Sequence, residues 1–231
     1  TLTVTKTALA AGGDTVLVPD EVVTYTVEIE NTGLAPAYDL VLDDVIPVGM
    51  RNGTATISMV STTILPADGK TNIAPTYNST TGLATWNFDS GTANEYTIDA
   101  GQTLRIVYEV QTDSDIGAGQ SLTNQATART YYSFDDDDVP ALGGVTGVRE
   151  IYGPSNTSST TLTTAAPGVL LKENPADTTV SIGETFTYTI TVPETPIPTY
   201  LHDVRILDSL LEKVYRDSGY DFRDYKRGTI T

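Results

Sequence analysis

The feature that most constrains this chain is a repeated alternation of threonine and other polar residues with apolar ones. It is clearest at 23–29 and 104–110, and turn sequences such as the Asn-Thr-Gly at 31–33 separate the alternating segments. Successive side chains of a strand point to opposite faces, so a period of two is typical of half-buried strands. We therefore predict an all-β sandwich with little helix, the one candidate helix lying at 209–215.

Three polar residues interrupt the apolar faces of these predicted strands. Lys6, Asp44 and Asn124 each stand in phase with apolar residues two positions away on either side. The in-phase neighbours are Leu2, Val4 and Ala8 for Lys6, Leu40, Leu42 and Ile46 for Asp44, and Leu122, Ala126 and Ala128 for Asn124. The alternation thus directs an amine, a carboxylate and a carboxamide into the core. Because burying an unpaired charge is costly, we expect the three groups to interact.

An amine, an acid and a carboxamide in one core can form a Lys–Asn isopeptide bond without an external enzyme. Burial favours the uncharged forms, which lowers the pKa of Lys6 and raises that of Asp44. Lys6 would attack the side-chain carbonyl carbon of Asn124 and ammonia would leave, while Asp44 polarises the carboxamide and moves protons. The alternative is a lysine at a sheet edge that pairs with Asp43 or Asp44, with Asn124 satisfying a turn.

The front part of this pattern recurs later in the chain. Lys6 has a counterpart in Lys172, at an offset of 166 (172 − 6), and Asp44 has one in Asp208, at an offset of 164 (208 − 44). A Thr-Tyr-Thr motif recurs at an offset of 163 (188 − 25). Similar offsets for three features predict an internal repeat, in which Lys172 and Asp208 are the second-domain candidates for the same chemistry.

The repeat sets the predicted domain boundaries. A complete β-sandwich is expected over 1–165, closed by a threonine-rich strand at 156–164, and the N-terminal part of a second sandwich over 166–231. The second copy has no asparagine to match Asn124. Either the sequence is an excerpt, or another chain completes this sheet.

In their order along the chain, the motifs resemble the DUF11 family of bacterial surface repeats, which is related to fimbrial domains that form isopeptide bonds. The motifs are Thr5-Lys6-Thr7, Val23-Thr24-Tyr25-Thr26-Val27, Asn31-Thr32-Gly33, Asp44-Val45-Ile46-Pro47 and Leu122-Thr123-Asn124-Gln125-Ala126. The resemblance implies immunoglobulin-like sandwiches in tandem on large secreted or wall-attached proteins, acting as stalk, adhesin or fibre modules. The second copy departs from this pattern, with Val192-Pro193-Glu194 in place of the Asn-Thr-Gly turn and no proline shortly after Asp208.

A run of acidic residues is the other conspicuous cluster. It comprises Asp135, Asp136, Asp137 and Asp138, to which Asp113 and Asp115 could add ligands. Calcium takes six to eight oxygen ligands from carboxylates and carbonyls, although no EF-hand spacing is present here. The alternative to a calcium site is a solvated acidic loop.

Charge and motif content narrow the classes of function. The formal net charge of −17 argues against binding to nucleic acid or to anionic membranes, and the absence of cysteine excludes disulfides and thiolate catalysis. No apolar run long enough to span a bilayer is present, and no nucleophile elbow, phosphate loop or zinc signature occurs. We expect no enzymatic turnover beyond a single self-crosslinking event and no required cofactor, with calcium as an optional ligand.

The sequence therefore predicts a structural stalk module of a bacterial extracellular surface or fibre protein. Its expected partners are neighbouring repeats or identical subunits, together with a host or glycan ligand. Two alternatives remain open. One is a filament subunit that assembles by strand complementation through the incomplete second domain. The other is a ligand-binding adhesin, in which Trp86 with Tyr77 forms a glycan platform unless Trp86 packs in the core.

Overall fold

The computed structural model describes residues 1–13, 15–51, 57–65, 72–89, 96–136, 149–173, 179, 181, 183–185 and 187–208. Within these ranges the chain forms strands and turns, and no helix long and apolar enough to cross a membrane occurs among them. The chain divides into two compact units, Thr1–Tyr200 and Leu201–Thr231. The candidate helix at 209–215 lies outside the described residues.

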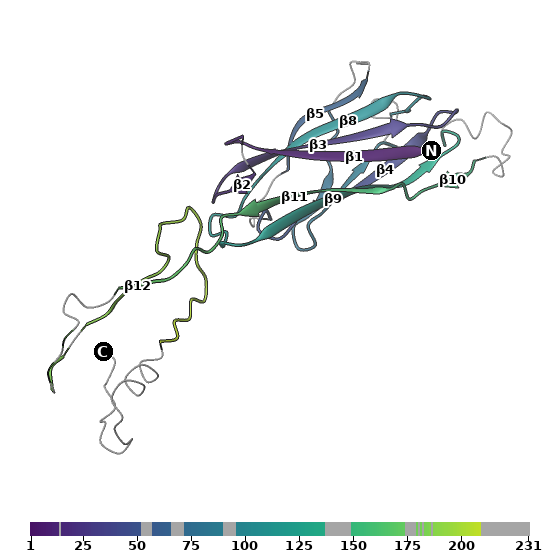
Figure 1. The fold of residues 1–231 in the computed structure, drawn as a ribbon. Coiled ribbons are helices and arrows are strands. Elements are labelled where there is room, and N and C mark those ends of the chain that lie inside the picture. The colour runs from purple at the N-terminus through teal and green to yellow at the C-terminus, as the bar shows by residue number, and fades with distance from the viewer. Residues whose placement is uncertain are drawn as a thin grey trace. The chain divides into compact units, whose positions relative to one another are not determined.

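Two antiparallel-rich sheets face each other in the first unit and form an immunoglobulin-like sandwich, which confirms the predicted fold class (Figure 1). The first sheet has the order β1 (Leu2–Ala10), β3 (Val22–Asn31), β8 (Thr103–Gln111) and β5 (Ser58–Leu65). The second has the order β2 (Val16–Leu17), β11 (Thr157–Thr164), β9 (Ser121–Tyr132), β4 (Tyr38–Val45), β7 (Leu83–Asn87) and β6 (Thr76–Asn78), and β10 (Ile151–Tyr152) also pairs with β9. The threonine-rich closing strand is β11, as predicted.

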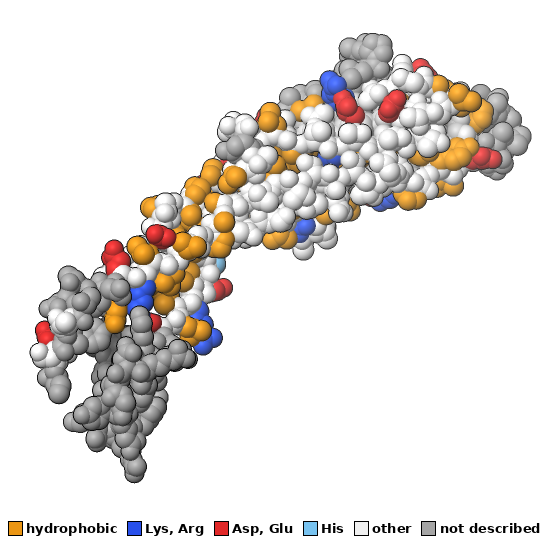
Figure 2. All heavy atoms as spheres, viewed as in Figure 1, with side chains coloured by type: hydrophobic (Ala, Val, Ile, Leu, Met, Phe, Trp, Pro, Cys, Tyr) orange, Lys and Arg blue, Asp and Glu red, His pale blue; other side chains and the backbone are white. Residues whose placement is uncertain are grey.

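The period-two pattern of the sequence places one face of each strand in the core. In β1 and β9, buried residues alternate with exposed ones along most of the strand. The largest fully buried side chains include the aromatic residues Trp86, Tyr25, Tyr96, Tyr108 and Phe88. The outward positions carry mainly threonine, serine and other uncharged polar residues, so few charged or hydrophobic side chains appear on the face of the sandwich in Figure 2.

Side chains of β11 hold β1, which is the edge strand of the first sheet. The two strands lie side by side in Figure 1 although they come from opposite ends of the sandwich sequence. The Asn156 carboxamide, just before β11, accepts from Val4 N at 2.9 Å and donates to Val4 O at 2.8 Å. Ser158 Oγ accepts from Lys6 N at 2.9 Å. We call Asn156 and Ser158 the edge clasp, because they satisfy backbone groups of β1 that would otherwise lack a strand partner.

The chain also forms a third sheet of two strands, and its pairing matches that of β1 with β3. In β1 and β3, Lys6 pairs with Val27, and in β12 (Leu171–Glu173) and β13 (Thr189–Thr191), Lys172 pairs with Ile190. Lys6 Nζ lies 4.7 Å from the ring centroid of Tyr25, and Lys172 Nζ lies 4.3 Å from that of Tyr188. The two strand pairs thus share the same register and the same lysine–tyrosine contact, at the sequence offsets from which the internal repeat was predicted.

The edge clasp leads to a stability prediction. Asn156→Ala should lower the free energy of unfolding by about 1–2 kcal/mol, because it leaves two backbone groups of β1 without a partner. The measurement is urea denaturation in an Asn124→Ala background, which cannot form the predicted crosslink. Thr161→Ala is the matched control, since Thr161 is an exposed residue of β11 whose hydroxyl bonds only to that of Thr123 among the described contacts. Equal unfolding midpoints for the two variants would contradict the clasp.

Candidate functional site

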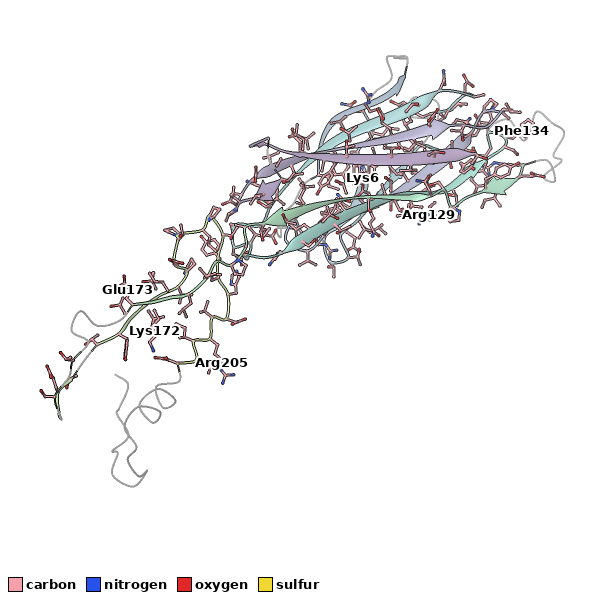
Figure 3. All side chains as sticks on the ribbon, in the orientation of Figure 1. Lys6, Arg129, Phe134, Lys172, Glu173 and Arg205 are labelled. Carbon is pink, nitrogen blue, oxygen red and sulfur yellow. The ribbon has the colours of Figure 1, made fainter. Side chains whose placement is uncertain are left out.

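Lys6, Asp44 and Asn124 meet between the two sheets. Lys6 belongs to β1 of the first sheet, whereas Asp44 and Asn124 lie on the paired strands β4 and β9 of the second. Asp44 is opposite Ala126, so Asn124, two residues away on the same face, takes the diagonal position. The exposed fraction is 5% for Lys6 and 0% for the other two. Figure 3 labels Lys6 beside its strand, β1, which lies above β11 in this view.

The hydroxyl of Tyr108, on β8, joins the three groups. It accepts from Lys6 Nζ at 2.7 Å and from Asn124 Nδ2 at 3.0 Å, and it donates to Asp44 Oδ2 at 2.7 Å. Lys6 Nζ also donates to the same oxygen of Asp44 in a direct ion pair. The amine and the carboxamide nitrogen therefore contact one and the same oxygen atom.

Aromatic rings surround the lysine ammonium. Nζ lies 5.0 Å from the centroid of the Tyr108 ring, in addition to its contact with Tyr25. The Tyr25 and Tyr108 rings stack with centroids 5.4 Å apart, and the Trp86 ring lies 5.3 Å from that of Tyr108. Such contacts stabilise a cation, but they replace water and so make the site poorly solvated.

Burial shifts the pKa of each titratable group at the site. Burial lowers the pKa of Lys6, and the neighbouring Asp44 opposes this effect. Burial raises the pKa of Asp44, with Lys6 and the Tyr108 hydroxyl acting in the opposite direction. Burial, together with the charge of Asp44, raises the pKa of Tyr108 well above its ordinary value. The site therefore favours a neutral amine, a protonated carboxyl group and a protonated phenol.

Two buried oxygens of the site lack hydrogen bonds to any described residue. They are Asp44 Oδ1 and Asn124 Oδ1. A buried acceptor without a donor is costly, and a carboxylate oxygen more so than a neutral one. A proton on Asp44 Oδ1 would remove the charge from this atom and turn it into a donor.

The geometry agrees with one part of the edge-lysine alternative and contradicts the rest. Lys6 lies on the edge strand β1 and pairs with Asp44, but its side chain is fully buried and does not extend to solvent. Asp43 Oδ2 instead lies 3.3 Å from Arg129 Nη1, and Asp43 Oδ1 accepts a hydrogen bond from Thr85 Oγ1 at 2.8 Å. Asn124 stands inside β9, opposite Thr160 of β11, and is not part of a turn.

The acidic residues that lie close together in the structure are not the set that the sequence predicted as a calcium site. Asp136 groups with Asp39 and Asp89, with one carboxylate oxygen of each lying within 4.8 Å of the others. This group contains neither Asp113, which is half-buried, nor Asp115, which is exposed. Asp135 is half-buried, while Asp137 and Asp138 lie outside the described residues.

An arginine already occupies part of this acidic group. Arg149 pairs with the buried Asp39 and stacks 3.6 Å from the ring centroid of Tyr132. Burial raises the pKa of Asp39, which Arg149 opposes, and burial also raises that of Asp89, with Asp136 adding to the shift. The described carboxylates that could hold a cation are therefore Asp39, Asp89 and Asp136, beside a resident guanidinium.

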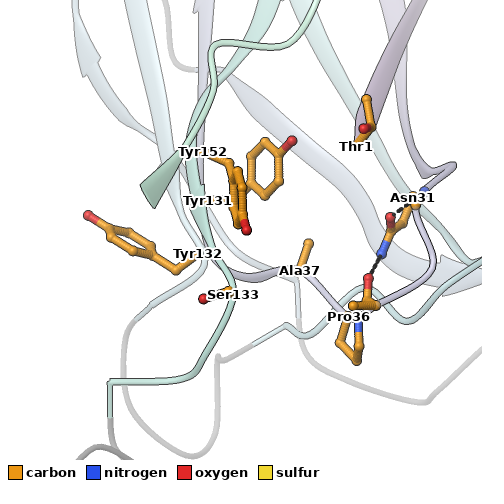
Figure 4. A pocket seen from close by; sticks show the side chains of 10 residues that line it. Thr1, Asn31, Pro36, Ala37, Tyr131, Tyr132, Ser133 and Tyr152 are labelled. Atoms are coloured by element: carbon orange, nitrogen blue, oxygen red, sulfur yellow. Dashed lines mark hydrogen bonds between the residues drawn. The ribbon is translucent and has the colours of Figure 1, made fainter. Parts of the chain in front are cut away.

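Trp86 has an exposed fraction of 0% and packs in the core, so it does not form the glycan platform that was the alternative to core packing. A pocket of about 220 Å³ lies elsewhere, near the N-terminus (Figure 4). Its aromatic lining comes from Tyr131, Tyr132 and Tyr152, of which Tyr131 and Tyr152 stack with centroids 5.5 Å apart.

The second-copy candidates are both exposed. Lys172 lies on β12 in the first compact unit and contacts Tyr188, as described above. Asp208 lies in the second unit. The presence of a crosslink in the second copy stays a prediction.

Comparisons with known proteins gave structural matches only. No protein-family model and no curated protein matches the sequence, so the DUF11 resemblance stays a prediction. The chain is similar to the C-terminal domain of the AgI/II polypeptide BspA of Streptococcus agalactiae, with TM-score 0.46, 13% identity and coverage of 85% of this chain and 62% of that one.

Two further structures are similar at lower TM-scores. The major pilin subunit BcpA of Bacillus cereus has TM-score 0.39, 10% identity and coverage of 74% of this chain and 42% of that one. A collagen-binding domain of a Staphylococcus aureus adhesin has TM-score 0.37, 11% identity and coverage of 68% and 95%. This chain thus spans less than two thirds of the BspA and BcpA structures.

The buried pair leads to a prediction about pH. In the folded, uncrosslinked chain, burial raises the pKa of the Asp44 carboxyl above its ordinary value of 3.8 and lowers that of Lys6 below its ordinary value of 10.5. Between 3.8 and the folded carboxyl pKa, the folded chain therefore holds more protons than the unfolded chain, and between the folded lysine pKa and 10.5 it holds fewer.

Stability follows these differences in proton number. The contribution of the pair should fall as the pH rises above about 4, because the unfolded carboxyl loses its proton first, and it should recover as the pH rises toward about 10, because the folded lysine loses its proton first. The measurement is the difference in unfolding free energy between Asn124→Ala and Asn124→Ala with Lys6→Met and Asp44→Asn, taken across pH. A contribution that is largest near neutral pH would contradict these pKa shifts.

Proposed function

We propose that this chain is a structural module of a bacterial extracellular surface or fibre protein, stabilised by an autocatalytic isopeptide bond between Lys6 and Asn124. The observation that carries the proposal is the contact of both Lys6 Nζ and Asn124 Nδ2 with the Tyr108 hydroxyl, inside a core closed to solvent. The attacking and leaving nitrogens are thus held together by the fold. Such positioning can replace an external enzyme for a reaction that happens once.

The reaction balances without a cofactor or an oxidant. The Lys6 ammonium first transfers a proton to the Asp44 carboxylate, which gives a neutral amine and a carboxylic acid. Nζ then attacks Cγ of Asn124, the Cγ–Nδ2 bond breaks, and Nδ2 leaves as ammonia. Of the two protons that Nζ loses, one remains on Asp44 and the other completes the ammonia.

Asp44 would act in this reaction as a general acid and base. Its direct contact with Nζ suits it to accept the first proton, and burial raises its pKa, which favours the protonated acid. The transferred proton lies on Asp44 Oδ2, the oxygen that contacts both Lys6 Nζ and the Tyr108 hydroxyl.

The product would connect the two sheets covalently. Lys6 lies on the first strand of the sandwich and Asn124 on β9, so the bond would close a loop that contains most of the domain. Closing a long loop reduces the conformational entropy of the unfolded chain, as a disulfide does, and stabilises the fold by several kcal/mol. A chain with no cysteine would gain this crosslink without an oxidising environment.

Intact-mass spectrometry tests the crosslink directly. The purified chain should be lighter than its sequence by one ammonia, because one molecule leaves for each bond formed. Lys6→Ala, Asp44→Ala and Asn124→Ala should each restore the sequence mass. Lys172→Ala is the matched control and should keep the loss, since Lys172 is exposed in the second copy. An unshifted mass of the unmodified chain would exclude the bond.

Single-molecule pulling from the two ends tests the mechanical role. Force would pass through the Lys6–Asn124 bond and bypass the residues between them. The chain should therefore extend less on unfolding than Asn124→Ala, by about 400 Å at roughly 3.5 Å per residue. Equal extensions of the two chains, in samples whose mass shows the ammonia loss, would contradict a load-carrying crosslink.

A further inference from the structure

We propose that the Tyr108 hydroxyl is a catalytic proton relay, which carries the proton from Asp44 to the leaving nitrogen of Asn124. This inference rests on the proposed crosslink and assigns a step of it to a residue outside the Lys–Asp–Asn set. The relay explains how an acid that faces the lysine can serve a leaving group on another strand.

The geometry places Tyr108 between the acid and the leaving group. Its oxygen lies 2.7 Å from Asp44 Oδ2 and 3.0 Å from Asn124 Nδ2. The described hydrogen bonds of the Asp44 side chain go to Lys6 and Tyr108. The Asn124 carboxamide donates to Tyr108 and also interacts with the Tyr25 hydroxyl. Among the described groups, the Tyr108 hydroxyl is thus the one that hydrogen-bonds to both the acid, Asp44, and the leaving nitrogen, Asn124 Nδ2.

Two proton movements complete the step. Attack of Nζ on Cγ turns Nδ2 into an amine nitrogen with a free lone pair, so both hydrogen bonds of Tyr108 can reverse. The proton on Asp44 Oδ2 then passes to the Tyr108 oxygen, and the proton of Tyr108 passes to Nδ2. The Cγ–Nδ2 bond then breaks and ammonia leaves. Asp44, now a carboxylate again, takes the remaining excess proton from Nζ. Tyr108 ends as it began, so the overall balance of the reaction is unchanged.

The surroundings of Tyr108 suit it to a relay that remains neutral. Its ring is fixed between Tyr25 and Trp86, so the position of the hydroxyl oxygen is set by packing and does not depend on a mobile side chain. Burial and the charge of Asp44 raise its pKa well above the ordinary value, which disfavours a free phenolate. Simultaneous acceptance and donation of a proton avoids that charged species.

Tyr108→Phe is the variant that isolates the hydroxyl, because it keeps the packed ring. Linear chain recovered in urea is diluted into buffer to start folding, and the loss of ammonia is followed by intact mass. The expected result is a rate of bond formation slower by about 10²-fold or more. The matched control is Tyr96→Phe, which removes the hydroxyl of another fully buried tyrosine, packed edge-on against Phe88. This control should form the bond at the unmodified rate.

A proton inventory on the unmodified chain makes the test independent of any variant's folding. The rate is measured in mixtures of light and heavy water under conditions in which folding, followed by fluorescence, is faster than the mass change. A relay moves two protons in one step, so the rate should depend on the deuterium fraction along a curve. A straight line would indicate a single proton in flight and would overturn the relay.

The outcomes separate this inference from the proposed function. No ammonia loss in the unmodified chain would remove the crosslink itself. Ammonia loss in the unmodified chain with the same rate in Tyr108→Phe would leave the crosslink and reject the relay. A slowed Tyr108→Phe whose near-ultraviolet circular dichroism matches that of folded Lys6→Ala would support the relay over a loss of structure.

Discussion

The candidate site depends on the buried pair of Lys6 and Asp44, which joins the two sheets. Both side chains are fully buried, and no described polar group other than Tyr108 contacts the pair. A charged pair in such a place gains its mutual attraction only by giving up hydration, and the balance is often unfavourable. A neutral amine beside a neutral acid avoids this cost, and it is also the state that the proposed crosslink requires. The burial that makes the ion pair costly is therefore the same burial that favours the proposed reaction.

The site also requires that β1 of the first sheet is aligned with β4 and β9 of the second. Lys6 comes from the outermost strand of the first sheet, which backbone hydrogen bonds fix on one side only, at β3. The edge clasp fixes the other side: Ser158 bonds to the backbone of Lys6 itself, and β11 pairs with β9, which carries Asn124. The strands of Lys6 and Asn124 are thus both registered against β11. The non-covalent fold would therefore align the two residues before the proposed crosslink forms.

Local alternation was enough to predict the sandwich and the meeting of Lys6, Asp44 and Asn124, because parity along a strand decides which face a side chain takes. Tyr108 shares the core-facing parity of Leu104, Ile106 and Val110, so its burial was also readable from the sequence. Its place between the three groups was not, because that depends on the order of strands in both sheets and on how they face each other. Trp86 shows the same limit in a simpler form: its parity allowed either core or surface, and the packing of β7 beside β4 decided for the core.

Asp39 shows where parity itself fails. Alternation in β4 places it with the outward residues Val41 and Asp43, yet it is 2% exposed. A register shift between Tyr38 and Val41 and a left-handed backbone at Asp39, with φ of 49°, turn this residue inward. Such a bulge re-aims a side chain without any change in composition, so an acidic group built from Asp39, Asp89 and Asp136 could not be found from the aspartate run alone.

Asp203 has φ of 53° and precedes Asp208 as Asp39 precedes Asp44, by five positions (208 − 203 and 44 − 39). Asp203 thus has the left-handed backbone of Asp39 at the same distance before its acid, which agrees with the predicted internal repeat.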